Sequence, residues 1–473
     1  MLKAVEFVYK PIRAFRKIIL LSLFLPIQVL GQTIPSADSL DIIINQCLKY
    51  LKDTQKSTTV ADSHFAGEWP TFMEMRTGYI LLGTQKKVYD SNCFALAGMM
   101  NILADVYRID TNLNQIPRML EIAYPQLISY KDNNGFNFWP SLQPNGKMLS
   151  KEDSARTDVK VRRPLRFKIL NNYIRRAANI MNDNDDTAQG LLAEWNYQSI
   201  SGNSIIHEEF PRFDDYRDTL RSNIHYYNHF ARDPRSSGAF LTWRGEEQAF
   251  PTQNLVKLLI NNALFLTPKS TAYPYAYQPY MPYGSNDVDA VVNANVLATL
   301  ATLKIKSDGI DGASNFIEQK IKRKKWSRAG IYYPNRYQIH YAVMKAWKSG
   351  VLSLSNCIEP LIDHIKTSQL PNGSFESRRI VNKKDAIQST AYALNAMLKL
   401  GNPQITGLDK NVTSALNYLL YQAHFENGKA YWHGGVYFSG GTVIRNTLYW
   451  KSDALTTAII LESLCLMRKY HSN

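Results

Sequence analysis

One type of segment recurs along this 473-residue chain and constrains its fold more than any other feature. Each copy opens on a polar residue, usually aspartate, and continues with small and apolar residues. Aspartate is a preferred N-cap, so each copy predicts the start of a buried helix. The predicted helix starts are Asp90, Asp186, Asp289, Asn335, Asp385 and Asp453.

Amphipathic segments lie between these buried helices. Apolar residues follow helical spacing on one face of residues 40–52, 120–131, 357–369 and 412–422. Several of these segments end in a turn that contains glycine and an aromatic residue. A buried helix and an amphipathic helix make a hairpin, and six hairpins that close on themselves make a ring. We therefore predict an all-α fold, a single (α/α)6 toroid over residues 32–473, with insertions near residues 141–166 and 200–285.

The N-terminus reads as a secretory signal peptide over residues 1–31. Basic residues from Lys3 to Lys17 precede the apolar run at residues 18–25, and a small residue, Gly31, follows. This apolar run is too short to span a membrane comfortably. We expect an exported protein, periplasmic or extracellular, with cleavage near Gly31.

The chain carries a formal net charge of +15, which favours contact with an anionic membrane surface. It contains no nucleic-acid-binding motif, so no nucleic acid partner is predicted. The four cysteines form no C-x-x-C pair, and we predict neither a metal nor a cofactor. In an oxidising compartment, Cys47 and Cys357 are candidates for a disulfide.

The strongest chemical signal is the segment Asp183-Asn184-Asp185-Asp186-Thr187-Ala188. Three carboxylates this close cannot all ionise freely, so at least one should retain its proton. A carboxylic acid that is protonated near neutral pH can serve as a proton donor. Helix N-capping is the alternative role, and it accounts for one of the three aspartates.

This segment resembles the D-x-D-D-T-A signature of class II terpenoid cyclases, the squalene-hopene and oxidosqualene cyclase group. Gln369 and the turn Asn372-Gly373-Ser374-Phe375 resemble the Q-W repeat of the same group. The resemblance implies a helical toroid and a cyclisation that starts with protonation of an alkene or epoxide. It also implies that Asp185 is the acid, that Asp183 and Asp186 tune it, and that aromatic residues stabilise cations.

A second polar cluster, residues 286–289 with Asn293 and Asn295, opens another predicted inner helix. One of the two asparagines should point into the ring, and carboxylates facing each other across it would suit glycan hydrolysis. The predicted substrate-binding residues are Asp287, Asp289, Asn293, Trp243, Tyr337, His340 and Trp432. Packing or hydrogen bonding in the core is the alternative role for these tryptophans and for His340.

The D-D-x-x-D pattern at Asp214-Asp215-Tyr216-Arg217-Asp218 resembles the diphosphate–metal motif of class I terpene enzymes. Magnesium would require more oxygen ligands than this segment offers. The leading prediction is thus an exported acid-initiated cyclase or isomerase acting on an isoprenoid or lipid. The alternatives are a glycan-active toroid enzyme and a non-catalytic toroid that binds a glycan, lipid or protein.

Overall fold

The computed structural model describes residues 35–60, 63–75, 87–133, 135–142, 161–162, 164–166, 180–202, 210–219, 236–245, 286–377, 385–440 and 448–471. The chain divides into two units, residues 1–36 and residues 37–473, and the elements below belong to the second unit. The predicted signal peptide lies outside the described residues, as do most residues of the two predicted insertions.

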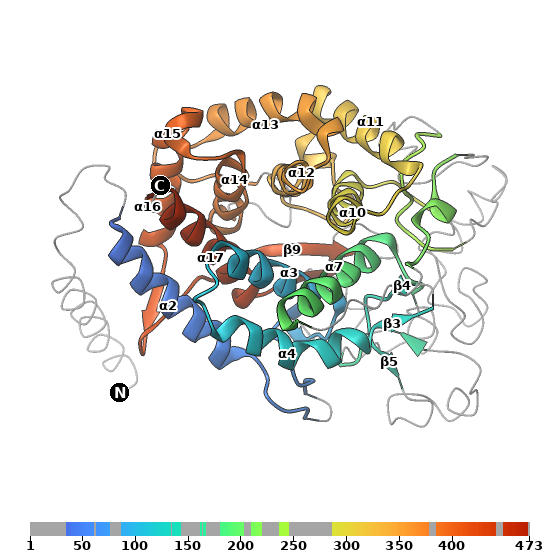
Figure 1. Cartoon of the computed structure of the whole chain (residues 1–473), viewed down its shortest axis with the longest axis horizontal. Helices are drawn as coiled ribbons and strands as arrows, with labels where there is room; N and C mark the ends of the chain where they lie inside the picture. Colours follow the sequence, from blue (N-terminus) through green and yellow to red (C-terminus); the bar gives the residue numbers. More distant parts are fainter. Residues whose placement is uncertain are drawn as a thin grey trace, which may run out of the picture. The chain divides into compact units, whose positions relative to one another are not determined.

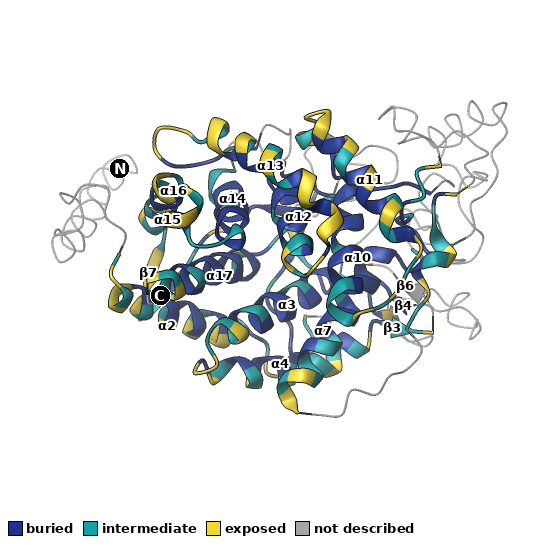
Figure 2. Ribbon diagram, turned by 45° about the horizontal axis from the view of Figure 1, so that its top comes forward, coloured by how far each residue is buried: buried dark blue, intermediate teal, exposed yellow. Residues whose placement is uncertain are grey.

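A closed ring of helices forms the centre of residues 37–473. Its members, in chain order, are α3 (Cys93–Ile109), α7 (Asn184–Ser201), α10 (Ala290–Leu303), α12 (Gln338–Lys348), α14 (Ala386–Leu400) and α17 (Asp453–His471). Each helix packs against the next, and α17 packs against α3, which closes the ring (Figure 1). These helices correspond to the six predicted buried helices. They are buried over most of their surface, as their small and apolar residues require (Figure 2).

Amphipathic helices form an outer layer, with exposed residues on their outward faces (Figure 2). They are α2 (Ala37–Thr54), α4 (Gln115–Ile128), α11 (Gly309–Lys322), α13 (Ser355–Ser368), the short α15 (Pro403–Thr406) and α16 (Asp409–Tyr421). The helix α2 packs on α17, α4 on α3 and α7, α11 on α10, α13 on α11 and α12, and α16 on α14. Within the described ranges, short 3-10 helices lie at η2 (Phe213–Tyr216), η5 (Trp326–Arg328) and η6 (Leu352–Leu354).

Three of the turns that lead into inner helices, those ahead of α7, α14 and α17, share one hydrogen bond. The backbone N–H of a fully buried aromatic residue donates to a threonine hydroxyl near the start of the next inner helix. The pairs are Phe136 with Thr187 (3.1 Å), Phe375 with Thr390 (3.0 Å) and Trp432 with Thr457 (3.2 Å). The threonine of the acid motif therefore belongs to the structural repeat rather than to the chemistry of the aspartates.

Gly373 shows why such a turn needs glycine. Its φ is +85°, and a Cβ at this position would lie 2.1 Å from the backbone oxygen of Ser414. The Gln369 side chain then ties the turn to the next outer helix, because its Nε2 donates to the carbonyl oxygens of Gly373 (3.0 Å) and Asn411 (2.9 Å). The predicted Q-W-like turn is thus a helix-to-helix clamp.

The prediction of an all-α chain is wrong in one respect, because the structure also contains short strands. Four of them form an antiparallel sheet in the order β2-β1-β10-β9, and the others pair as three two-stranded ladders. The sheet strands are β1 (Phe72–Met75), β2 (Lys87–Tyr89), β9 (Val436–Gly440) and β10 (Leu448–Lys451). The paired strands are β3 (Lys131–Asp132) with β4 (Gly135–Phe136), β5 (Ser141–Leu142) with β6 (Val161–Arg162), and β7 (His424–Glu426) with β8 (Lys429–Tyr431).

The strand β9 lies across the ring, between the row α17, α3, α7 and the row α14, α12, α10 (Figure 1). The backbone N–H of Ser439 in β9 donates to the carbonyl oxygen of Tyr332, just ahead of α12, at 2.8 Å. The aromatic ring of Phe438 in β9 lies 5.4 Å from that of Phe94, at the start of α3. The sheet therefore covers the end of the ring at which the inner helices begin.

The cysteines Cys47, Cys93, Cys357 and Cys465 are all free and buried. The disulfide considered between Cys47 and Cys357 is therefore absent. Among the helices that the structure describes, none combines the length and the apolar character that crossing a bilayer requires.

Candidate active site

The acid motif occupies the N-terminus of α7, and its aspartates have different roles. Asp183 is the N-cap, and its Oδ1 accepts the backbone N–H of Asp186 at 2.7 Å. Asp185 instead points toward the neighbouring inner helix, α10, and the segment ahead of α12. Its Oδ1 accepts a hydrogen bond from Nδ2 of Asn295 in α10 at 2.9 Å, and its Oδ2 accepts the hydroxyl of Tyr333. Capping therefore explains Asp183 but not Asp185.

Burial raises the pKa of all three carboxyl groups. The side chain of Asp185 is 5% exposed, and its pKa rises to about 7 because burial and the charge of Asp183 outweigh the hydrogen bonds from Tyr333 and Asn295. The pKa of Asp183 rises to about 6, mainly through burial. Burial and the neighbouring Asp183 and Asp185 hold the pKa of Asp186 well above its usual value. The raised pKa favours the protonated form of Asp186, whose carboxyl group shares a hydrogen bond with that of Asp183.

A cluster of aromatic rings adjoins Tyr333, the tyrosine that donates to Asp185. The ring of its partner Tyr333 lies 5.8 Å from Phe94 and 6.1 Å from Phe438, and Tyr332 stacks on Phe438 at 5.9 Å. The predicted residue Trp243 joins this cluster, because its Nε1 donates to the Tyr332 hydroxyl at 3.1 Å. Aromatic faces attract a cation within about 6 Å of the ring centre. The site therefore combines a partly protonated acid with groups that can stabilise positive charge.

The second polar cluster holds residues around this site in place. Asp287 accepts hydrogen bonds from the Tyr332 hydroxyl (2.7 Å) and from Oγ1 of Thr242 (2.5 Å), so it orients an aromatic residue of the site. Asp289 is the N-cap of α10, where it accepts the backbone N–H of Val291 at 2.7 Å. Its other oxygen accepts the backbone N–H groups of residues 331 and 332. Both carboxylates are thus engaged within the protein.

The asparagine that faces the ring is Asn295, whereas the predicted substrate-binding residue was Asn293. Asn293 exchanges hydrogen bonds with the backbone of Phe240, at 2.9 Å in each direction. It therefore fastens the segment at residues 236–245 to α10. Side chains two positions apart on a helix point in different directions, and the sequence did not determine which asparagine points inward.

Three other predicted substrate-binding residues face the outer layer instead of Asp185. The Tyr337 hydroxyl donates to Oγ of Ser368 in α13 at 3.0 Å, and Nε2 of His340 lies 2.8 Å from Nδ1 of His364 in the same helix. Trp432 is fully buried, and its Nε1 donates to the carbonyl oxygen of Leu419 in α16 at 2.6 Å. These three side chains thus contact the outer helices, and their role in substrate binding stays a prediction.

The D-D-x-x-D segment serves as local structure. Asp214 accepts Oγ of Ser307 (2.7 Å) and the backbone N–H of Gly309 (3.1 Å) at the start of α11. Asp218 accepts both the hydroxyl (2.6 Å) and the backbone N–H (2.8 Å) of Ser237. Across the described ranges, no group of three or more His, Cys, Asp or Glu residues is placed to hold a metal ion.

A second pair of buried acids, Glu68 and Asp90, lies near the start of α3. Asp90 was predicted to open this helix, but its N-cap is Asn92, and the pairing of Asp90 with Glu68 was not predicted. Burial raises the pKa of Asp90 to about 6 and that of Glu68 to about 7. Asp90 accepts Nε1 of Trp450 at 2.7 Å, and Glu68 accepts Oγ of Ser91 at 2.9 Å. Both carboxyl groups accept further protein donors, so we assign them to the structure around the sheet.

Sequence reasoning also missed Tyr333, Phe94 and Phe438. These residues come from the segment before α12, from α3 and from β9, and they meet only in the folded ring. No spacing along the chain connects them to Asp185. The only hint of a partner for Asp185 was the pair Asn293 and Asn295, one of which was expected to point into the ring.

No protein-family model and no curated protein matches the chain. Solved structures, in contrast, match the chain. The type II terpene cyclase MstE from Scytonema, in complex with its substrate geranylgeranyl dihydroxybenzoate, is 12% identical, with 92% of this chain and 99% of that chain covered at a TM-score of 0.50. The same cyclase in complex with its product merosterolic acid A is 13% identical, with 92% and 98% covered at a TM-score of 0.50. The chain therefore has the fold of the type II terpene cyclases.

Proposed function

We propose that this protein is an acid-initiated cyclase or isomerase of an isoprenoid, with Asp185 as the proton donor. The observation that carries the proposal is the orientation of Asp185. It does not cap its own helix, and it faces Asn295, Tyr333 and a cluster of aromatic rings. The ligands of the similar MstE structures, a geranylgeranyl compound and its cyclised product, support an apolar isoprenoid substrate.

The proposed reaction conserves the atoms of the substrate. The Asp185 carboxyl group gives its proton to an alkene carbon, and the neighbouring alkene closes on the resulting cation. The final cation loses a proton to water and Asp185 regains one from water, so that the product is an isomer of the substrate and the acid is restored. The hydrogen bonds from Tyr333 and Asn295 stabilise the carboxylate that Asp185 becomes. The rings of Phe94 and Phe438 stabilise the cation.

The same proposal includes export directed by residues 1–31 and a single six-hairpin toroid built on the ring. Glycan hydrolysis has less support, because Asp289 is occupied as a helix cap and Asp287 by Tyr332 and Thr242. The comparisons lend no support to a membrane partner either. Trp243, Asp287 and Asn295 are retained as residues that shape the substrate site.

Isotope labelling tests the proposed reaction directly. The purified protein is incubated in H2O and in D2O with geranylgeraniol and with geranylgeranyl dihydroxybenzoate. We expect an isomer of the substrate in H2O and, in D2O, the same product with one deuterium bonded to carbon. A product without deuterium would contradict protonation, and the absence of any isomer from both compounds would contradict the cyclase assignment.

The reaction should also weaken as the pH rises. Only the protonated form of Asp185 can act, and its pKa is about 7. We expect kcat to level off at lower pH and to fall about tenfold per pH unit above pH 7. Geranylgeraniol suits this measurement because it does not ionise in this range. A rate that rises between pH 7 and 9 would indicate that Asp185 acts as a base.

A further inference from the structure

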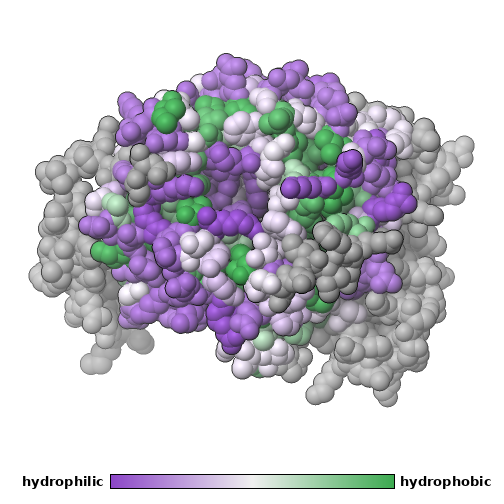
Figure 3. All heavy atoms as spheres, viewed as in Figure 1, coloured by the Kyte–Doolittle hydropathy of each residue, from purple (hydrophilic) through white to green (hydrophobic). Residues whose placement is uncertain are grey.

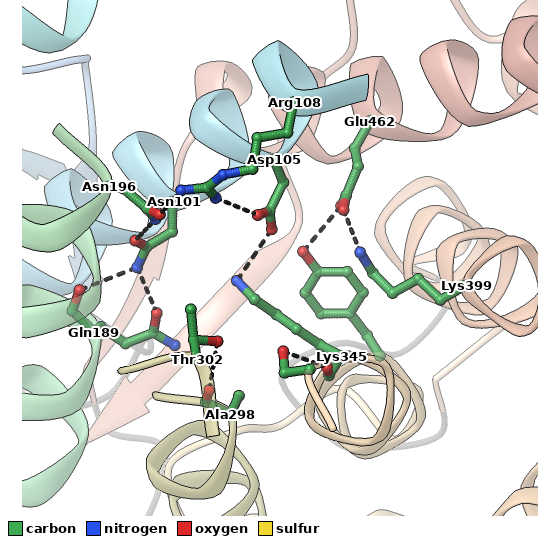
Figure 4. Close-up of polar contacts among 12 residues, drawn as sticks. Asn101, Asp105, Arg108, Gln189, Asn196, Ala298, Thr302, Lys345, Lys399 and Glu462 are labelled. Atoms are coloured by element: carbon green, nitrogen blue, oxygen red, sulfur yellow. Dashed lines mark hydrogen bonds and ion pairs between the residues drawn. The ribbon is translucent and has the colours of Figure 1, made fainter. Parts of the chain in front are cut away.

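The end of the ring opposite Asp185 is lined by charged and polar side chains. Arg108, Lys345 and Lys399 lie in the last turns of α3, α12 and α14, respectively. Figure 4 shows them turned toward the interior together with Asp105 and Glu462. In the view of Figure 3, hydrophilic residues surround a recess in the middle of this face.

These residues continue the helix faces that carry the acid site. On α3, the residues Phe94, Asn101, Asp105 and Arg108 follow one helical stripe from the aromatic cluster to this opposite end. On α7, the same spacing leads from Asp185 to Asn196, whose Oδ1 accepts Nη2 of Arg108 at 2.5 Å. At 1.5 Å per residue, Asn196 lies about 16 Å from Asp185 along the helix. One elongated ligand could therefore touch both ends.

The charged residues that Figure 4 labels do not balance one another, whereas Arg468, at the same end of α17, pairs separately with Asp41 and Asp110. Lys399 pairs with Glu462, which also accepts the Tyr341 hydroxyl at 3.1 Å. The remaining carboxylate, Asp105, is shared by two cations, with Arg108 at 3.4 Å and Lys345 at 3.5 Å. Two cations with one carboxylate leave one positive charge in excess. This cluster therefore suits an anion.

Lys345 is the clearest candidate to meet such an anion. Its side chain is 14% exposed, whereas Lys348 in the same turn is exposed to solvent. An ammonium group offers three hydrogen-bond donors, and burial removes much of its hydration. The contact with Asp105 at 3.5 Å is long, so it replaces only part of that hydration.

We propose that Lys345 and Arg108 bind the anionic head group, a carboxylate or phosphate, of an isoprenoid whose tail reaches Asp185. The inference rests on the proposed function and narrows its substrate to an amphiphile rather than a hydrocarbon. The rival role is structural, because cations near helix C-termini also stabilise the helix dipole. That role predicts an effect of substitution on stability but none on head-group preference.

Binding of saturated ligands tests the head group without any turnover. The probes are phytanic acid, phytanyl phosphate and the methyl ester of phytanic acid, which have no alkene and cannot be cyclised. At pH 8 we expect each anion to bind the wild-type protein at least tenfold more tightly than the ester does. The tighter of the two anions identifies the head group as a carboxylate or a phosphate.

Variants then assign the preference to residues. Lys345→Met should weaken binding of the anion at least tenfold and leave the affinity for the ester unchanged. Lys348→Met, the same change on the exposed face of α12, should alter neither. Equal binding of acid and ester, or a Lys345→Met protein that keeps the preference, would overturn the inference. Because the probes cannot react, this result is independent of whether Asp185 protonates an alkene.

Discussion

Replacing Asp185 with asparagine is expected to lower the rate of cyclisation by about 10²–10⁴-fold, the range that a positioned general acid contributes. An asparagine keeps the size of the side chain and can still accept from Asn295 or Tyr333, but its amide has no proton to give. The proton would then have to come from water in a site where Asp185 is only 5% exposed. Product formation from the isoprenoids that the wild-type protein converts is the measurement.

A matched control separates this effect from a general effect of removing a carboxylate. Asp308→Asn makes the same change at a side chain that is 92% exposed, so we expect the wild-type rate. Circular dichroism and thermal unfolding of the Asp185→Asn protein should show that the fold is intact. If Asp185→Asn retains most of the activity while both proteins are folded, Asp185 is not the acid.

The fold was predictable where the same local sequence pattern recurs along the chain. The sequence marks the start of each inner helix by a polar residue followed by small and apolar residues, and this pattern needs no distant partner. The Asp289 and Asp385 caps form as predicted, whereas α7 is capped by Asp183 instead of Asp186 and α3 by Asn92 instead of Asp90. The strands were missed because they are two to five residues long and form through distant pairing. In the sheet, Phe72 of β1 lies opposite Lys451 of β10.

The site was predictable only at its centre. Asp185 could be identified because an excess of aspartates over the needs of capping is visible in the sequence. Its partners Tyr333 and Asn295 could not, since their side chains reach it only once the ring has closed. The orientation of Tyr337 and His340 could not be predicted for a related reason. In α12, one lysine (Lys345) faces the interior of the ring and another (Lys348) faces solvent, so polarity alone does not mark the inward direction.

Replacing Lys399 with methionine is expected to lower the free energy of unfolding by about 3–5 kcal/mol, the cost of leaving a buried carboxylate unpaired. Lys399 is 8% exposed and Glu462 is 1% exposed, so water cannot substitute for the missing ammonium group. Burial acts to lower the pKa of Lys399, but the carboxylates of Glu462 and Asp105 outweigh it and raise the pKa. The lysine is therefore charged at neutral pH. The midpoint of urea unfolding is the measurement.

A second substitution shows whether the cost comes from the unpaired charge. The double variant Lys399→Met with Glu462→Leu removes both charges and should regain most of the lost stability, because apolar residues of similar volume replace a buried ion pair at little cost. Lys348→Met, on the exposed face of α12, should change stability by no more than about 0.5 kcal/mol. If the double variant is no more stable than Lys399→Met alone, the loss arises from packing between α14 and α17. If stability recovers, the Lys399–Glu462 ion pair joins α14 to α17 but can be replaced by apolar packing.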